Sequence, residues 1–174
     1  MTTTTTATYW TELDSPVGRL LLTAAPDGAL TSLSVPGQKG GRAVREDWRH
    51  DAGPFRAAGE QLAAYFAGEL TEFRLPLRAE GTAFRERVWA ALDDVPYGEI
   101  AARIGASRPA VRAVGGAIGA NPLLILRPCH RVIGADGSLT GYAGGLERKT
   151  RLLALEGVPA PAPSRPVPPP ATPR

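Results

Sequence analysis

The sequence has little sulfur and no long apolar run. One of its 174 residues is cysteine and one is methionine, which excludes an internal disulfide and a zinc site of several thiolates. No apolar run approaches the ~20 residues that a membrane span needs. The first ten residues, MTTTTTATYW, lack the basic and apolar regions of a secretory signal. We therefore expect a cytoplasmic protein that holds no metal and no other cofactor.

The composition is otherwise that of a globular protein. Hydrophobic residues make up 43% of the chain, enough for the core of one medium domain or two small ones. The net charge is +3, with a slight acidic excess in residues 1–76 and a slight basic excess in residues 77–157. A basic half permits nucleic-acid binding, but ordinary surface charge explains it equally well.

Residues 1–76 have the pattern of a small α/β domain. Three short β-like runs, separated by the turn sequences DSPVG and PDG, predict an antiparallel meander over residues 8–35. Residues 36–54 are rich in glycine and charge and predict a long loop. A helix follows Pro54, and its apolar residues share one face: Phe55, Leu62, Tyr65 and Phe66.

Residues 77–157 have a mainly helical pattern. Thr82 is a candidate N-cap for a helix whose apolar stripe is formed by Phe84, Val88, Trp89 and Leu92. We expect a short helix at 100–105, a second helix that begins near Ser107, a strand at 123–126 and a closing helix that ends at Gly157. The tail, residues 158–174, contains 8 of the 17 prolines and is predicted to be disordered.

The two helices joined by GAS have the outline of a helix-turn-helix. On the second helix, the polar face carries Arg112 among the small residues Ala113 and Gly116. Such a face allows a close approach to the minor groove, where a lone arginine could fill the space left by an extruded base. Tight packing against another helix would favour the same small residues, so the pattern leaves both interpretations open.

The single cysteine, Cys129, stands in the segment PCHR. The thiolate is the reactive form of cysteine, and the neighbouring His130, Arg127 and Arg131 would lower the pKa of the thiol. Pro128 argues against a regular strand and favours a tight turn. Glu156 ends the closing helix, where a carboxylate opposes the helix dipole. This placement suggests that Glu156 orients His130, although an ordinary surface glutamate would fit too.

Five segments together identify a family. GTAFRERVWAAL, PYGE, RAVGGAIGANP, PCHRVIGADGSLTGYAGGLERK and LLALEG occur in this order, and the chain thereby resembles the O6-alkylguanine-DNA alkyltransferases, or methylated-DNA–protein-cysteine methyltransferases. The resemblance is continuous over residues 81–157 and weaker in SPVGRLLL and EQLAAYFAGEL. It implies a ribonuclease-H-like α/β domain over 1–76 and a mostly α domain with a helix-turn-helix over 77–157.

The resemblance also implies a chemistry. An alkyl group on guanine O6 would pass to Cys129 once per molecule and without a cofactor, with O4-alkylthymine open as a second substrate. His130 would deprotonate Cys129 through a water, Glu156 would hold His130, and Asn121 would brace the turn. The base would be bound by Tyr97, Val132, Tyr142 and Ala143, and the DNA by Arg112, Ala113, Gly116 and Ser107. The implied partner is double-stranded DNA containing alkylated guanine, bound by a monomer and away from membranes.

The chain departs from the family pattern after PYGE. Family members usually have roughly half a dozen further residues there, which include a second tyrosine. Tyr97 aligns with either tyrosine, so its role stays open. Arg127, where an aliphatic residue is common, could lower the pKa of the thiol, meet a phosphate or face solvent.

Three other functions compete with repair. The first is a protein that binds alkylated bases without transfer, impaired by the shortened segment at 97–101. The second is a helix-turn-helix regulator, although only Arg112 on its recognition helix suits base readout. The third is a cysteine hydrolase, for which no oxyanion-hole pattern is found.

Overall fold

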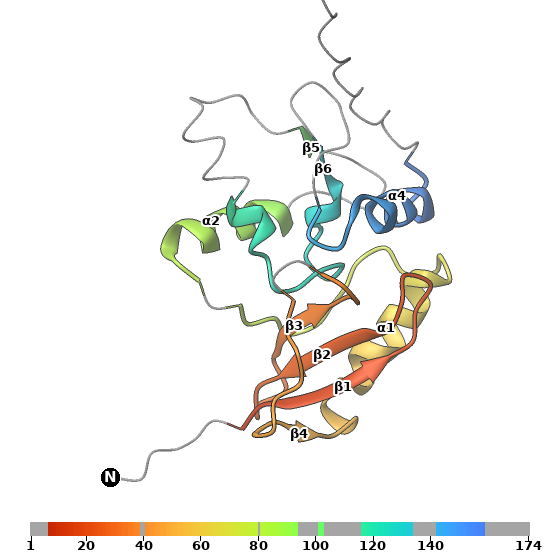
Figure 1. The fold of residues 1–174 in the computed structure, drawn as a ribbon. Helices are drawn as coiled ribbons and strands as arrows, with labels where there is room; N and C mark the ends of the chain where they lie inside the picture. Colours follow the sequence, from red (N-terminus) through yellow and green to blue (C-terminus); the bar gives the residue numbers. More distant parts are fainter. Residues whose placement is uncertain are drawn as a thin grey trace, which may run out of the picture.

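The structure is a computed structural model, and it describes residues 7–38, 41–79, 81–93, 101–102, 116–133 and 142–158. Its N-terminal half contains a four-stranded sheet with the strand order β3-β2-β1-β4 (Figure 1). The strands are β1 (Tyr9–Leu13), β2 (Leu20–Ala24), β3 (Leu30–Ser34) and β4 (Arg49–His50).

The first three strands form the predicted antiparallel meander. β4 pairs in parallel with β1, so the segment predicted as a loop over 36–54 contains a short strand. Two backbone bonds hold this strand, from the Arg49 amide to the Thr8 carbonyl at 2.8 Å and from the Asp51 amide to the Trp10 carbonyl at 3.1 Å. The sequence of this segment, rich in glycine and charge, predicted a loop. A strand of only two residues at the edge of a sheet is too short to leave a periodic apolar pattern, so it could not be recognised.

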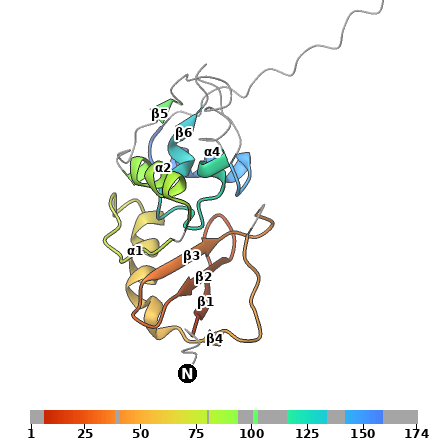
Figure 2. The same cartoon turned by 90° about the vertical axis from the view of Figure 1, so that its left-hand side faces the viewer.

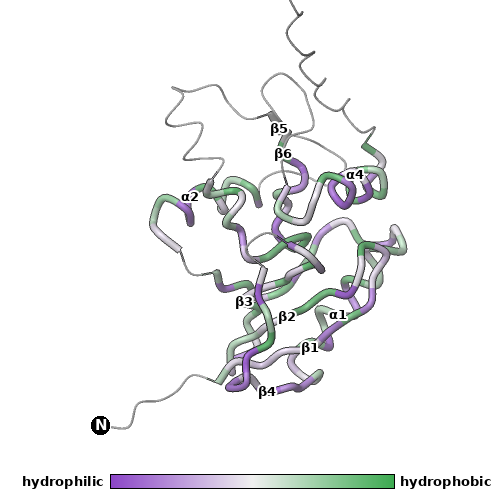
Figure 3. The backbone as a smooth tube through the Cα atoms, viewed as in Figure 1, coloured by the Kyte–Doolittle hydropathy of each residue, from purple (hydrophilic) through white to green (hydrophobic). Residues whose placement is uncertain are grey.

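A helix covers one face of the sheet (Figure 2). The 3₁₀ helix η1 (Gly53–Phe55) leads into α1 (Arg56–Phe66). The predicted apolar face is confirmed, since Phe55, Leu62 and Tyr65 are at most 3% exposed and Phe66 packs against the same core. Figure 3 shows the hydrophobic colouring of β2, which lies between β3 and β1 in this sheet.

The second half begins with α2 (Ala83–Asp93). The predicted cap is confirmed, because the Thr82 Oγ1 accepts a hydrogen bond from the Arg85 amide at 3.2 Å. Trp89 and Leu92 are buried, and the Trp89 indole donates to the Ala117 carbonyl at 2.8 Å. Phe84 is 38% exposed, so the predicted stripe is wrong there. The helix meets the core through its C-terminal half, and Phe84 lies in the first turn.

A two-stranded parallel sheet pairs β5 (Ala101–Ala102) with β6 (Val132–Ile133). The helix predicted at 100–105 is therefore wrong at residues 101–102. Alanine has no strong strand preference, so pairing with a distant segment decides the local conformation. Of the predicted helix-turn-helix, residues 116–119 are described, and they are helical. Residues 103–115 lie outside the described part of the chain.

The two halves share one hydrophobic core, which includes Leu22, Leu33, Trp89 and Leu152. At one contact the Leu33 amide donates to the Pro122 carbonyl at 2.9 Å and the Leu124 amide to the Leu33 carbonyl at 3.3 Å. The chain remains packed to Val158, which is 7% exposed and contacts Leu153.

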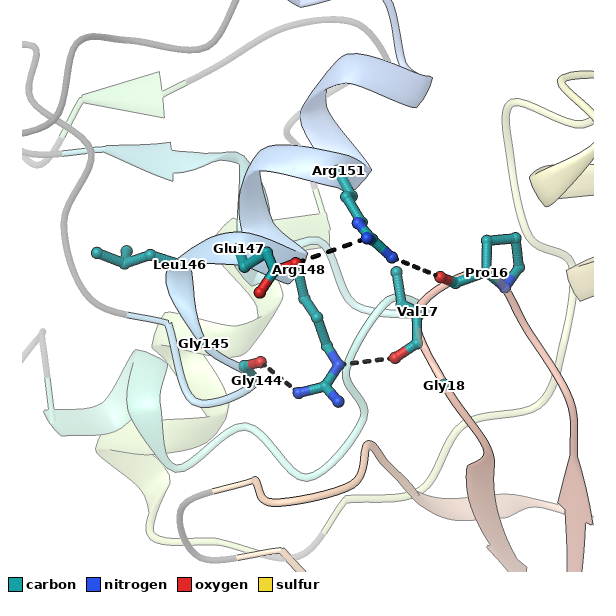
Figure 4. Close-up of a pocket in the computed structure, with 9 residues that line it drawn as sticks. All are labelled: Pro16, Val17, Gly18, Gly144, Gly145, Leu146, Glu147, Arg148 and Arg151. Carbon is teal, nitrogen blue, oxygen red and sulfur yellow. Dashed lines mark hydrogen bonds and ion pairs between the residues drawn. The ribbon is translucent and has the colours of Figure 1, made fainter.

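A second contact joins α4 (Leu146–Leu155) to the turn between β1 and β2 (Figure 4). The Arg148 Nε donates to the Val17 carbonyl at 2.7 Å, and Arg151 donates to the Pro16 carbonyl at 3.0 Å. A cleft lies between these elements, with Gly18 on one side and Gly145 on the other. Among the described residues, no helix has the length and apolar character of a membrane span.

Candidate active site

The segment before the cysteine is a buried turn. Residues 123–126 were predicted to be a strand, but only Leu123 makes a bridge, to Leu33 of β3, and residues 124–126 turn. All four side chains are at most 7% exposed. An apolar run that is buried on all sides has the sequence pattern of an interior strand, so periodicity could not separate the two structures. Ile125 has a φ of 69°, a strained value for a β-branched residue.

The side chain of Asn121 holds this turn together. Its Oδ1 accepts a hydrogen bond from the Leu123 amide at 3.1 Å. Its Nδ2 donates to the Leu123 carbonyl at 3.3 Å and to the Arg127 carbonyl at 3.4 Å. Asn121 is 2% exposed. By bonding to the backbone of both Leu123 and Arg127, the Asn121 side chain fixes a turn that lacks the hydrogen bonds of a regular strand pair.

The PCHR segment turns sharply, as Pro128 led us to expect. Cys129–Arg131 form the 3₁₀ helix η2, which carries Cys129, 4% exposed, and His130, fully buried, into the core. The His130 Nε2 lies 2.5 Å from the Glu156 Oε2. An ionised carboxylate only accepts hydrogen bonds, so Nε2 carries the proton and Nδ1 keeps its lone pair. Nδ1 has no hydrogen-bond partner among the described residues.

Glu156 stands just past α4 and is 5% exposed, so the alternative of a surface glutamate is wrong. Gly157, with a φ of 78°, ends the helix immediately after it. The carboxylate receives two further hydrogen bonds besides that of His130. The Arg131 Nε donates to Oε1 at 2.6 Å, and the Tyr65 hydroxyl donates to Oε2 at 2.6 Å.

These contacts set the charges of the site. Burial alone would raise the pKa of Glu156, but hydrogen bonds from His130, Arg131 and Tyr65, together with the charge that His130 carries when it is protonated, outweigh burial and lower that pKa to about 2. Burial lowers the pKa of His130, against the pull of Glu156. At neutral pH the site therefore holds a charged carboxylate beside a neutral imidazole.

Burial raises the pKa of the Cys129 thiol to about 11, although a hydrogen bond with Asn121 and the charges of Lys149 and Arg127 oppose it. The prediction of a readily ionised thiol is therefore wrong for this structure. The cationic neighbours are present, but desolvation of the thiolate outweighs them. Arg127 is engaged elsewhere, because its guanidinium lies 3.4 Å from Asp93 and over the Trp89 ring at 5.6 Å.

Two of the predicted base-binding residues, Val132 and Tyr142, lie near the cysteine. Val132 follows η2 directly, and its carbonyl accepts a hydrogen bond from the buried Lys149 Nζ. Tyr142 and Ala143 lead into α4. The Tyr142 hydroxyl is buried, has no partner among the described residues, and has its pKa raised by burial and by the nearby Cys129.

Of the remaining predicted residues, the structure describes one. Gly116 is exposed on the helical segment 116–119. Tyr97, Ser107, Arg112 and Ala113 lie outside the described residues. Across the parts of the chain that are described, no group of three or more acidic, histidine or cysteine side chains could hold a metal ion.

Three further residues of the site were not predicted from the sequence. Tyr65 was assigned to the apolar face of α1, Arg131 was noted only as positive charge, and Lys149 was not singled out. Each makes a buried hydrogen bond at the site. The one sequence feature that could have indicated them is a polar or charged residue within an otherwise apolar segment. The contact of Tyr65 with Glu156, however, joins residues 91 positions apart in the sequence and leaves no local pattern.

Known proteins with a similar sequence cover nearly the whole folded part. The family model described as the ribonuclease-like domain of 6-O-methylguanine DNA methyltransferase matches residues 8–79, and the model of the DNA binding domain of the same proteins matches residues 83–158. The methylated-DNA–protein-cysteine methyltransferase of Mycolicibacterium paratuberculosis is 52% identical over 156 residues, which are 86% of this chain and 93% of the relative.

More distant organisms and solved structures agree. The protein of the same name from Methanosarcina acetivorans is 46% identical and covers 86% of this chain and 98% of its own. Mycobacterium tuberculosis OGT, solved in complex with DNA, is 49% identical, covers 88% of this chain and 96% of its own, and superimposes with a TM-score of 0.76. The chain belongs to the 6-O-methylguanine DNA methyltransferase family, with a ribonuclease-like N-terminal part and a DNA-binding C-terminal part.

Proposed function

We propose that this protein repairs DNA by moving an alkyl group from O6 of guanine directly to the sulfur of Cys129. The observation that carries the proposal is the buried array of Cys129, His130 and Glu156 in a chain of this family. The sulfur attacks the alkyl carbon, a C–S bond forms and the C–O6 bond breaks. The electron pair of the broken bond stays on the guanine, which takes up a proton and becomes the ordinary base.

The acid–base chemistry follows from the charges of the site. The thiol, with its pKa raised to about 11, is protonated at rest and is thereby protected from other electrophiles. The His130 Nδ1, which has a free lone pair, accepts the thiol proton through a water as the sulfur attacks. The Glu156 carboxylate then stabilises the imidazolium cation. Because a thioether does not hydrolyse under physiological conditions, each molecule acts once.

We assign roles to the other residues by their place around the sulfur and by the family resemblance. Asn121 fixes the turn before Cys129, while Val132, Tyr142 and Ala143 form part of the pocket for the extruded base, with Tyr97 as a further candidate. The DNA meets the segment 107–116, which the sequence predicts to be helical, through Ser107, Arg112, Ala113 and Gly116. We expect a monomer that acts on double-stranded DNA in the cytoplasm and prefers alkylated guanine.

A titration tests stoichiometric repair. A fixed amount of duplex with one O6-methylguanine per strand pair is incubated with increasing protein, and the remaining lesion is counted by base analysis. We expect one lesion removed for each protein molecule added, with a sharp end point. Binding of the duplex without loss of the lesion would contradict transfer and support the base-binding alternative. Removal of many lesions per molecule would contradict the single use of Cys129.

A further inference from the structure

The active-site carboxylate is held partly from the other half of the molecule. Tyr65 lies on α1, in the ribonuclease-like part, and its hydroxyl donates to the Glu156 Oε2 at 2.6 Å. Oε2 is also the oxygen that faces the His130 Nε2. Tyr65 therefore bonds to the same atom that orients the histidine.

The geometry of Tyr65 is fixed by packing. The residue is 1% exposed, and its ring lies against Phe66 and Phe73, each with a centroid distance of 5.2 Å. A purely packing role would be filled by phenylalanine, because a buried hydroxyl costs desolvation free energy unless it is hydrogen-bonded. The hydrogen bond to Glu156 offsets the free energy of desolvating the Tyr65 hydroxyl.

We propose that Tyr65 is a positioning residue for alkyl transfer, through which the ribonuclease-like part holds Glu156 in line with His130. The inference rests on the proposed function, because it concerns the proton transfer from Cys129. Arg131 donates to Oε1 and Tyr65 donates to Oε2, so the two donors together help to set the plane of the carboxylate. Loss of the Tyr65 hydroxyl removes a donor from the oxygen that faces His130 and weakens the hold on that oxygen.

The contact has a consequence for the pH dependence. The charged and titratable groups near the carboxylate are His130 and Arg131 of η2, Tyr65 of α1, Lys149 of α4 and Tyr142 before α4. Tyr65 is one of the donors that lower the pKa of Glu156. With one donor fewer, the carboxylate binds protons more tightly and attracts a proton to His130 more strongly. Both effects move the loss of activity at low pH to a higher pH.

The variant Tyr65→Phe tests the proposal in the full chain. Single-turnover methyl transfer from an O6-methylguanine duplex is measured between about pH 5 and 9, together with the dissociation constant for the duplex. We expect the rate constant at neutral pH to fall roughly tenfold, the size expected for one lost hydrogen bond to a charged group. The acid limb of the rate profile should move to higher pH while the dissociation constant stays unchanged.

Phe73→Leu is the matched control. It disturbs the packing of the same ring without removing a donor to Glu156, so it should lower stability and leave the acid limb in place. In a Glu156→Gln background, Tyr65→Phe should have little further effect on the rate, because the carboxylate it orients is absent.

The outcomes separate two failures. If the wild-type protein transfers no methyl group, the proposed function is wrong. If the wild type transfers and Tyr65→Phe has the same rate and the same acid limb, only the role of Tyr65 is wrong. A shift of the acid limb by Phe73→Leu that equals the shift by Tyr65→Phe would also overturn it, since general loosening would then explain both.

Discussion

At the scale of the residue, burial keeps the Cys129 thiol protonated in the resting protein. Arginine, lysine and histidine surround Cys129, yet burial raises the pKa of its thiol to about 11. Glu156, with a pKa of about 2, stays charged across the physiological range. In the mechanism that we propose, the reactive ion therefore forms during the attack, with its proton on His130, rather than before the substrate arrives.

This charge arrangement predicts a sluggish cysteine in the resting protein. A pKa two units above the usual 9.0 leaves about a hundredfold less thiolate at neutral pH. Alkylation of the native protein by iodoacetamide at pH 7.5 should be at least that much slower than alkylation of the urea-unfolded protein. The native rate should keep rising up to pH 9.5, as measured by mass spectrometry. A rate that levels off below pH 8 would indicate an ionised thiol instead.

At the scale of the element, the sequence predicted those strands, helices and caps whose structure depends on neighbouring residues in the chain. The meander and the apolar face of α1 follow from turn residues and from periodicity, and the Thr82 cap from a hydroxyl placed before the apolar stripe. The turn at 124–126 and the strand β5 escaped prediction because contacts with Leu33 and with β6 decide them.

The same division holds within the site. Cys129, His130 and Glu156 were predicted from the residue types that nucleophilic chemistry needs, and the structure buries all three and pairs His130 with Glu156. Arg131 and Tyr65 also donate hydrogen bonds to the Glu156 carboxylate, from positions 25 and 91 residues away in the sequence. The Tyr65 contact depends on how the two halves pack and the Arg131 contact on how η2 packs against α4, and a single sequence contains no local signal of that packing.

The segment before α4 depends on a close approach at Gly144. A Cβ there would lie 2.8 Å from the Tyr142 Cε1 and 3.1 Å from the Val35 Cγ2. Gly144→Ala should therefore displace the Tyr142 ring, lower the free energy of unfolding by about 1–3 kcal/mol and slow methyl transfer. Urea denaturation and a single-turnover assay measure the two effects.

Gly119→Ala is the control for this substitution, because Gly119 is helical and no atom lies within 4 Å of the Cβ that the substitution adds. It should leave stability unchanged or raise it by up to about 1 kcal/mol. Equal stability and equal transfer rates in the two variants would refute the close-packing account of Tyr142.

At the scale of the whole molecule, the two halves act as one unit. They share a core, and α4 is tied to the β1–β2 turn by Arg148 and Arg151 (Figure 4). Arg148 also donates to the Gly144 carbonyl at 3.0 Å, so one side chain connects the N-terminal turn with the segment that carries Tyr142.

The variant Arg148→Met tests this connection, since it keeps the aliphatic stem and removes the donors. Its free energy of unfolding should fall by about 1–3 kcal/mol, as expected for a part-buried side chain that leaves two carbonyls without donors. Arg56→Met, which removes an ion pair with Glu60 whose side chains are 86% and 72% exposed, should change stability by less than about 0.5 kcal/mol. Equal losses in denaturant titrations would show that Arg148 does not join the halves.

The central claim concerns a new bond to one sulfur atom, and intact-mass spectrometry of the protein after incubation with an O6-methylguanine duplex tests it most directly. The account predicts that the protein gains the mass of one methyl group, that peptide mapping places the methyl on Cys129, and that Cys129→Ala gains nothing. An unchanged mass after the wild-type protein has bound the duplex, or a methyl group on any other residue, would contradict it.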